Sequence, residues 1–232
     1  MTDEMDARIN GLGASLFFHP RTVEFAAAQG VDNVFVLYAG RAGVLGDVNA
    51  AQAVSALGFF ASDVVADVWR GVTELGGPAR MGALFGDAMA AAAATLWSSE
   101  AAAEMVDMGR VVLQGVEPFG MALYAGWRER GLVGGASDVV HALRELRGDV
   151  HIQSVAAAGL HPLEAEMVTR GAAAAQLHGW KPPYPEPDAF AGRVAAAERA
   201  TSERMFDLYQ RVLGAERIVQ LAAAVRRLYP DT

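Results

Sequence analysis

The chain has 232 residues, of which 53% are hydrophobic and 20% are charged, and its formal net charge is −8. This length and hydrophobic content allow one large or two small globular domains with a sizeable core. The acidic balance argues against a protein that mainly binds nucleic acid, because neutralising phosphates is the main source of that affinity. The absence of cysteine excludes disulfides, thiolate nucleophiles and thiolate metal sites.

Neither a secretory signal nor a membrane span is apparent. The N-terminal residues Met1 to Asp6 are acidic, which is unlike a secretory signal. The longest apolar tract, Met89 to Trp97, is shorter than the roughly 20 residues needed to cross a bilayer. We therefore expect a cytoplasmic protein that does not enter the membrane.

The N-terminal third predicts consecutive helices. Residues 3–18 indicate a first helix, interrupted or bent around Gly11 and Gly13, and Pro20 opens the next. The apolar segment from Val31 to Leu45 is ambiguous between a strand and a buried helix. We favour a helix because the neighbouring segments are helical.

The rest of the chain continues the helical pattern. Helices are expected at about 79–97 and 99–115, and Ser98 provides a start signal for the second. Two final helices lie on either side of Gly214. These patterns predict a compact all-α protein of ten or more short helices, without a substantial β-sheet.

The segment from Leu143 to Gly159 has the densest group of chemically useful side chains. We expect Gly148 to end one helix, Asp149 to cap the next, and Gly159 to close it. His161-Pro162 then opens a third helix, with the proline at its first position.

Two short sequence segments each occur twice in the chain. Leu37-Tyr-Ala-Gly40 recurs from Leu123, and Ala61-Ser-Asp-Val-Val65 recurs from Ala136. A true duplication would produce two similar helical lobes with a pocket between them; the alternative is coincidence in a sequence rich in alanine and valine. The expected divisions are a first lobe at 1–97, a second lobe at 98–180, a proline-rich connector at 181–187, and C-terminal helices at 188–232 that pack on the lobes.

A possible acid–base group lies beside Gly148. If the backbone turned there, the side chains of Arg147, Asp149 and His151 could converge on one substrate. The alternative is that Asp149 only caps a helix and His151 packs beside it.

Arg41 is a second candidate, because an arginine in an apolar, glycine-rich segment is costly to bury without a partner. The partner is either a carboxylate such as Asp149 or an anionic ligand group. Tyr38 precedes it by one helical turn, and Phe59 and Phe60 are candidates for the apolar wall of a pocket. The glycines near Arg41 are too irregular for a phosphate-binding loop.

The five histidines do not predict a metal site, because the paired Glu-x-x-His motifs of a di-iron bundle are absent. A haem remains an alternative, since a single axial histidine can hold it.

The segments Tyr38-Ala-Gly-Arg-Ala-Gly-Val-Leu-Gly46 and Leu143-Arg-Glu-Leu-Arg-Gly-Asp-Val-His151 resemble a largely uncharacterised actinobacterial family. That family is helix-turn-helix-like and related to winged helices. Leu146 replaces a histidine of the family pattern, and Ser137-Asp138 replaces a Trp-His pair. A proline-rich segment and two helices stand where the family has a C-terminal wing. The resemblance therefore implies a member that lacks its wing and was recruited for its pocket.

We expect this protein to bind a small, mostly apolar organic molecule of the natural-product kind between the two lobes. The ligand-binding residues would be Tyr38, Arg41, Phe59, Phe60 and Arg147.

The first alternative is an acid–base isomerase, cyclase, lyase or hydrolase that uses His151, Asp149 and Arg41 as catalytic residues. A haem protein and a DNA-binding regulator using residues 137–171 are further alternatives. Nucleic acid is the less favoured partner, and a homodimer is compatible with the sequence.

Overall fold

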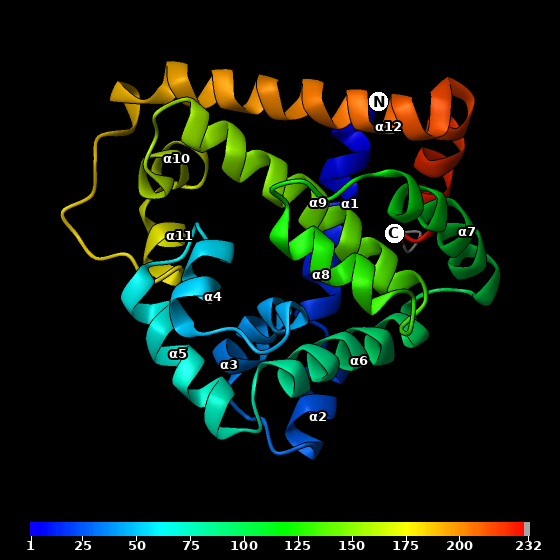
Figure 1. Cartoon of the computed structure of the whole chain (residues 1–232), viewed down its shortest axis with the longest axis horizontal. Helices are drawn as coiled ribbons and strands as arrows, with labels where there is room; N and C mark the ends of the chain where they lie inside the picture. The colour runs from blue at the N-terminus through cyan, green and yellow to red at the C-terminus, as the bar shows by residue number, and fades with distance from the viewer. Residues whose placement is uncertain (230–232) are drawn as a thin grey trace.

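The computed structural model describes residues 1–229, which form α-helices and two short 3-10 helices without a β-strand (Figure 1). The predicted all-α fold is confirmed. The elements are α1 (Thr2–Phe17), α2 (Pro20–Ala28), α3 (Val34–Ala39), η1 (Gly40–Leu45), α4 (Ala50–Ala56), α5 (Ser62–Glu74), α6 (Pro78–Leu96), α7 (Ser99–Gly115), α8 (Ala122–Arg130), α9 (Ala136–Ala157), α10 (Pro162–Thr169), α11 (Gly171–Leu177), η2 (Pro187–Ala189) and α12 (Ala191–Arg227).

A capping side chain or a proline marks the start of six of the twelve α-helices. Ser98 accepts a hydrogen bond from the backbone N–H of Ala101 and begins α7 as predicted. Pro20 and Pro162 open α2 and α10 at positions where their missing N–H has no helical partner. Helix α10 also has a capping box, in which His161 and Glu164 satisfy each other's backbone N–H groups.

Helix α9 lies at the centre of the fold (Figure 1) and contributes to all three groups of buried side chains. The first group joins α9 to α1, α7, α8 and α12. The second joins it to α2–α6 and to the C-terminal end of α1. A small third group links the end of α9 with α10 and α12. Residues carried by α9 are therefore held by most of the molecule.

The prediction that a helix ends at Gly148 is wrong, because α9 runs unbroken from Ala136 to Ala157. A mid-helix glycine costs about 1 kcal/mol relative to alanine, and the buried surface of α9 outweighs that cost. Asp149 caps a different helix: its Oδ2 accepts the backbone N–H of Tyr124, in the first turn of α8, at 2.9 Å. The predicted end at Gly159, which has φ +65°, is confirmed.

The predicted interruption of α1 is also wrong, because α1 is continuous through Gly11 and Gly13. A β-carbon at Gly11 would overlap the hydroxyl of Tyr229, and one at Gly13 would press on the side chain of Arg144. These glycines allow close packing against Tyr229 and Arg144.

The ambiguous segment from Val31 to Leu45 is helical, as predicted, and forms α3 followed by η1. Its glycines let η1 lie against the backbone of α6. A β-carbon at Gly43 would overlap the carbonyl oxygen of Pro78 and the backbone of Gly82. This close contact fixes the position of Arg41, between the two contacting glycines Gly40 and Gly43.

The C-terminal region crosses the whole molecule (Figure 1). Helix α12 has a kink at Gly214, where φ is 69° and ψ is 169°, so two helical segments flank this residue as predicted. The connector before it is anchored by Lys181, whose Nζ lies 3.0 Å from Asp63 Oδ2. Within residues 1–229, no helix is long and apolar enough to cross a membrane. The division into two repeated lobes remains a prediction.

Candidate functional site

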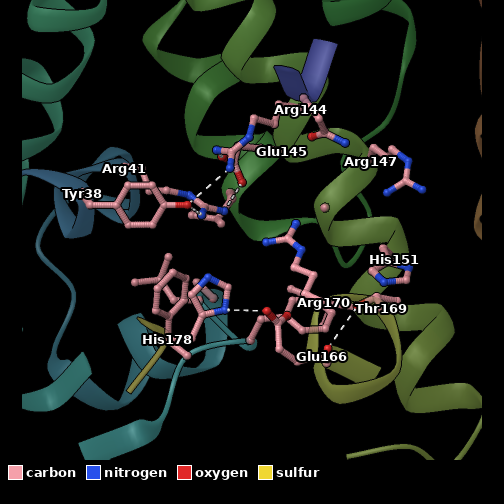
Figure 2. Close-up of a pocket in the computed structure, with 18 of the residues that line it drawn as sticks. Tyr38, Arg41, Arg144, Glu145, Arg147, His151, Glu166, Thr169, Arg170 and His178 are labelled. Carbon is pink, nitrogen blue, oxygen red and sulfur yellow. Dashed lines mark hydrogen bonds and ion pairs between the residues drawn. The ribbon is translucent and has the colours of Figure 1, made fainter. Parts of the chain in front are cut away.

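A polar cavity of about 190 Å³ lies between the segment α3–η1–α4, helix α9 and the segment α10–α11, with α1, α8 and α12 at its edges (Figure 2). Charged and polar side chains dominate its lining: Asn10, Tyr38, Arg41, Arg144, Glu145, Arg147, His151, Glu166, Thr169, Arg170, His178 and Glu198. The apolar part includes Leu57, Phe59, Phe60, Leu123 and Ile152.

Arg41 and Glu145 form a buried ion pair at one wall of the cavity. Arg41 Nη2 donates to Glu145 Oε2 at 2.8 Å, and the Glu145 side chain is only 1% exposed. Arg144 lies 3.4 Å from the second oxygen of the same carboxylate. The sequence left open a core carboxylate such as Asp149 or an anionic ligand group as the partner of Arg41; the carboxylate that pairs with it is Glu145 and not Asp149. Arg41 Nε is buried and has no hydrogen-bond partner among the described residues.

Tyr38 lies between two guanidinium groups. Its hydroxyl oxygen accepts hydrogen bonds from Arg41 Nη1 at 2.6 Å and from Arg144 Nη2 at 3.3 Å. Burial by itself raises the pKa of this phenol, but the two arginines outweigh burial and lower the pKa of Tyr38 to about 8. Among the described residues no acceptor takes the Tyr38 hydroxyl proton, which leaves it available to a ligand.

His151 has a defined hydrogen-bonding arrangement. The hydroxyl of Thr201 donates to the carbonyl oxygen of Ala197 at 2.8 Å, so it accepts from His151 Nδ1 at 3.1 Å. The other ring nitrogen, Nε2, lies 3.5 Å from Glu198, which also accepts from Arg147 at 3.0 Å. Burial lowers the pKa of His151, whereas Glu198 raises it.

Glu166 and His178 form a pair on the opposite wall (Figure 2). Glu166 Oε1 lies 3.3 Å from His178 Nδ1, without the alignment of a full hydrogen bond. Burial is the main cause that lowers the pKa of His178 to about 4 and raises that of Glu166. The imidazole is therefore neutral at pH 7.

Arg170 extends between these two walls (Figure 2). It follows the last residue of α10 and is exposed. No hydrogen bond or ion pair of its side chain occurs within residues 1–229. Among the described residues its guanidinium therefore has no partner, and it points into the cavity.

The structure brings most of the predicted site residues together. Six of the seven line the cavity: Tyr38, Arg41, Phe59, Phe60, Arg147 and His151. Asp149 does not, because on one helix it lies about 200° around the axis from Arg147 and from His151. Burial is the main cause that raises the pKa of Asp149 to about 7, although its hydrogen bond from Tyr124 lowers it.

Six ionisable residues that line the cavity were not among the predicted site residues: Arg144, Glu145, Glu166, Arg170, His178 and Glu198. A signal existed for some of them. Arg144, Gly148 and His151 have the spacing of one helix face, and Glu166 and Arg170 are four residues apart. No sequence pattern connects His178 or Glu198 to these residues.

The described residues contain no group of three or more His, Cys, Asp or Glu side chains arranged to hold a metal ion.

The sequence profile described as "Helix-turn-helix family" matches residues 2–228. The chain belongs to this helix-turn-helix family. The match includes every residue that lines the cavity. No curated protein and no solved structure matches the chain. In this helix-turn-helix family member, Arg170 lies between the short helices α10 and α11 and lines the cavity.

Proposed function

We propose that this protein binds a small organic anion in the cavity. The observation that supports this most is the convergence of four arginines from three segments on one small space: Arg41 from η1, Arg144 and Arg147 from α9, and Arg170 after α10. Three glutamates also line the cavity, so the cations outnumber the anions by one. Guanidinium groups hold carboxylates and phosphates through paired hydrogen bonds.

The cavity favours a small ligand with an apolar portion. Its volume of about 190 Å³ is below the roughly 300 Å³ at which pockets for drug-sized ligands begin. The rings of Tyr38 and Phe60 lie 5.5 Å apart, and Phe59 stacks on His151 at 5.5 Å. These aromatic faces suit the carbon skeleton of a ligand. The sequence favoured a mostly apolar molecule, and the arginines add an anionic group to that description.

Calorimetric titration with benzoate, its hydroxylated derivatives and short-chain carboxylates tests the proposal. Arg170→Gln should weaken the best ligand about tenfold or more, since a hydrogen bond to a charged group contributes about 1.5–3 kcal/mol. Arg199→Gln is the matched control, because Arg199 is exposed on α12 and does not line the cavity. The proposal fails if no anion binds, or if the two variants behave alike.

Acid–base catalysis on such an anion is a second candidate, supported by the fixed tautomer of His151. Its Nδ1 donates to Thr201, which leaves Nε2 as the atom that exchanges protons near Glu198. The revised group is thus His151, Glu198 and Arg147, without Asp149. If a substrate is found, His151→Ala should slow turnover about 100-fold, and an unchanged rate would exclude this role.

Haem and DNA binding have less support. A haem is larger than the drug-sized ligands that need pockets of roughly 300 Å³; a Soret band in the purified protein would overturn this view.

Residues 1–229 contain no β-strand that could form a wing. Helix α10, the last helix of the unit at 137–171, carries two glutamates and no arginine or lysine with which to contact phosphates. Salt-sensitive retardation of duplex DNA would restore a regulatory function.

A further inference from the structure

The wall formed by α10 and α11 carries two polar groups whose bonding capacity is not satisfied. Glu166 is 4% exposed, and within the described part of the chain its Oε1 and the Nδ1 atom of His178 are buried without a hydrogen-bond partner. His178, directly after α11, is its nearest ionisable neighbour at 3.3 Å. Buried polar side chains in native proteins are nearly always hydrogen-bonded, so an unsatisfied pair that lines a cavity indicates a missing partner.

The protonation of the pair determines what that partner offers. Because the imidazole is neutral at pH 7, it has one N–H and one lone pair. His178 Nδ1 faces Glu166 Oε1 at 3.3 Å, and a proton on Nδ1 keeps its lone pair from facing the lone pairs of that oxygen, although the two atoms are not aligned for a full hydrogen bond. In Figure 2 the second ring nitrogen faces across the cavity toward Tyr38 and Arg41. The pair therefore presents acceptors to the cavity and requires a donor from the ligand.

We propose that Glu166 and His178 form a second subsite that accepts a hydrogen bond from a hydroxyl group of the ligand, which makes the ligand a hydroxylated organic anion. This inference rests on the proposed function, because the arginines must hold the anionic end. The hydroxyl end then lies between Glu166 Oε1, which lacks a donor, and His178 Nε2.

An ammonium group is the other donor of suitable size, and the surrounding charges disfavour it. Arg170 and Arg41 act on the subsite as positive charges and both lower the pKa of His178. The same field repels a second cation from the ligand. A neutral hydroxyl satisfies the acceptors without this repulsion.

Matched probes separate this subsite from anion binding in general. Calorimetry would compare benzoate with 3-hydroxybenzoate and 4-hydroxybenzoate, which differ only in the presence and position of the hydroxyl group. In the wild-type protein, at least one hydroxybenzoate should bind about tenfold more tightly than benzoate, the discrimination expected when a buried acceptor would otherwise stay unpaired.

The variants Glu166→Gln and His178→Phe should each reduce that ratio to about one, and the ratio is the readout because both residues line the cavity and can change the affinity for all three probes together. Glu203→Gln is the control, because Glu203 is an exposed glutamate on α12 outside the cavity. Two variants on different elements guard against a single folding defect. In parallel, ¹H–¹⁵N correlation spectra at pH 7 should show His178 as the neutral Nδ1–H tautomer.

The outcomes are distinguishable. If benzoate and the hydroxybenzoates bind equally to the wild type, or if the ratio survives in both variants, the subsite is wrong while the proposed function stands. A charged His178, or the opposite tautomer, also overturns the subsite. If only short-chain carboxylates bind, the subsite is wrong while the proposed function stands; if no anion binds at all, the proposed function fails and the subsite fails with it.

Discussion

Replacement of Arg41 by methionine tests the electrostatic account of the cavity most directly. The change keeps most of the side-chain volume and removes the charge from the 2.8 Å pair with Glu145, whose side chain is 1% exposed. Removing one partner of a buried ion pair costs about 3–5 kcal/mol, because the remaining charge stays buried without compensation. Arg144 still lies 3.4 Å from Glu145, which places the expected loss at the lower end, about 3 kcal/mol.

The assay is urea unfolding followed by far-ultraviolet circular dichroism, together with a thermal melt. For a chain of this size, about 3 kcal/mol corresponds to a fall in Tm of roughly 6–12 °C. Arg70→Met is a matched control, because Arg70 also lies 2.8 Å from its partner, Asp67. The side chains of that pair are 70% and 66% exposed, so the loss should be about 0–1 kcal/mol.

A double variant completes the experiment. Arg41→Met combined with Glu145→Leu removes both charges and should recover at least about 1 kcal/mol relative to the sum of the two single losses. Equal losses for Arg41→Met and Arg70→Met would refute the argument that burial decides the strength of these pairs. Strictly additive losses in the double variant would show that Arg41 and Glu145 do not interact energetically.

Two further predictions concern the support of the site. Because the pKa of Asp149 is raised from 3.8 to about 7 in the folded state, its contribution to stability is complete below about pH 4 and is lost as the pH rises toward 7. As the pH rises across that range, the free energy of unfolding of Asp149→Asn should therefore increase relative to that of the wild type, by an amount on the order of a few kcal/mol. Unfolding measured at several pH values tests this, and parallel pH profiles would contradict it. Gly43→Ala should destabilise by about 1–3 kcal/mol, because its β-carbon overlaps the backbone of α6. Gly192→Ala, where a β-carbon meets nothing within 4 Å, should be neutral or slightly stabilising, and equal losses in the two variants would argue against close packing at η1.

Part of the site could be predicted from the sequence because the sequence signals for it are local. An arginine within an apolar, glycine-rich segment predicts a buried partner from the cost of desolvation alone, and Arg41 has one. Arg147 and His151 are four residues apart, so any helix that contains both places them on one face. The helical class of the chain follows from the same kind of short-range periodicity.

Local sequence signals gave a wrong prediction where tertiary packing outweighed the local helix-ending preference. Gly148 and Asp149 are a plausible helix end and helix start, yet α9 continues through them, because it is buried by several neighbouring helices. Asp149 does cap a helix, as its chemistry suggests, but the helix is α8, which begins 27 residues earlier in the chain than Asp149.

The sequence alone determined the helical class, several helix starts and the presence of a polar group around Arg41 and His151. Only the tertiary structure decided which charges meet. Arg41 and Glu145 are 104 residues apart, and His151 and Thr201 are 50 apart. Short-range rules can state that a buried charge needs a partner. They cannot name it, because the partner is selected by the packing of helices distant in sequence around α9.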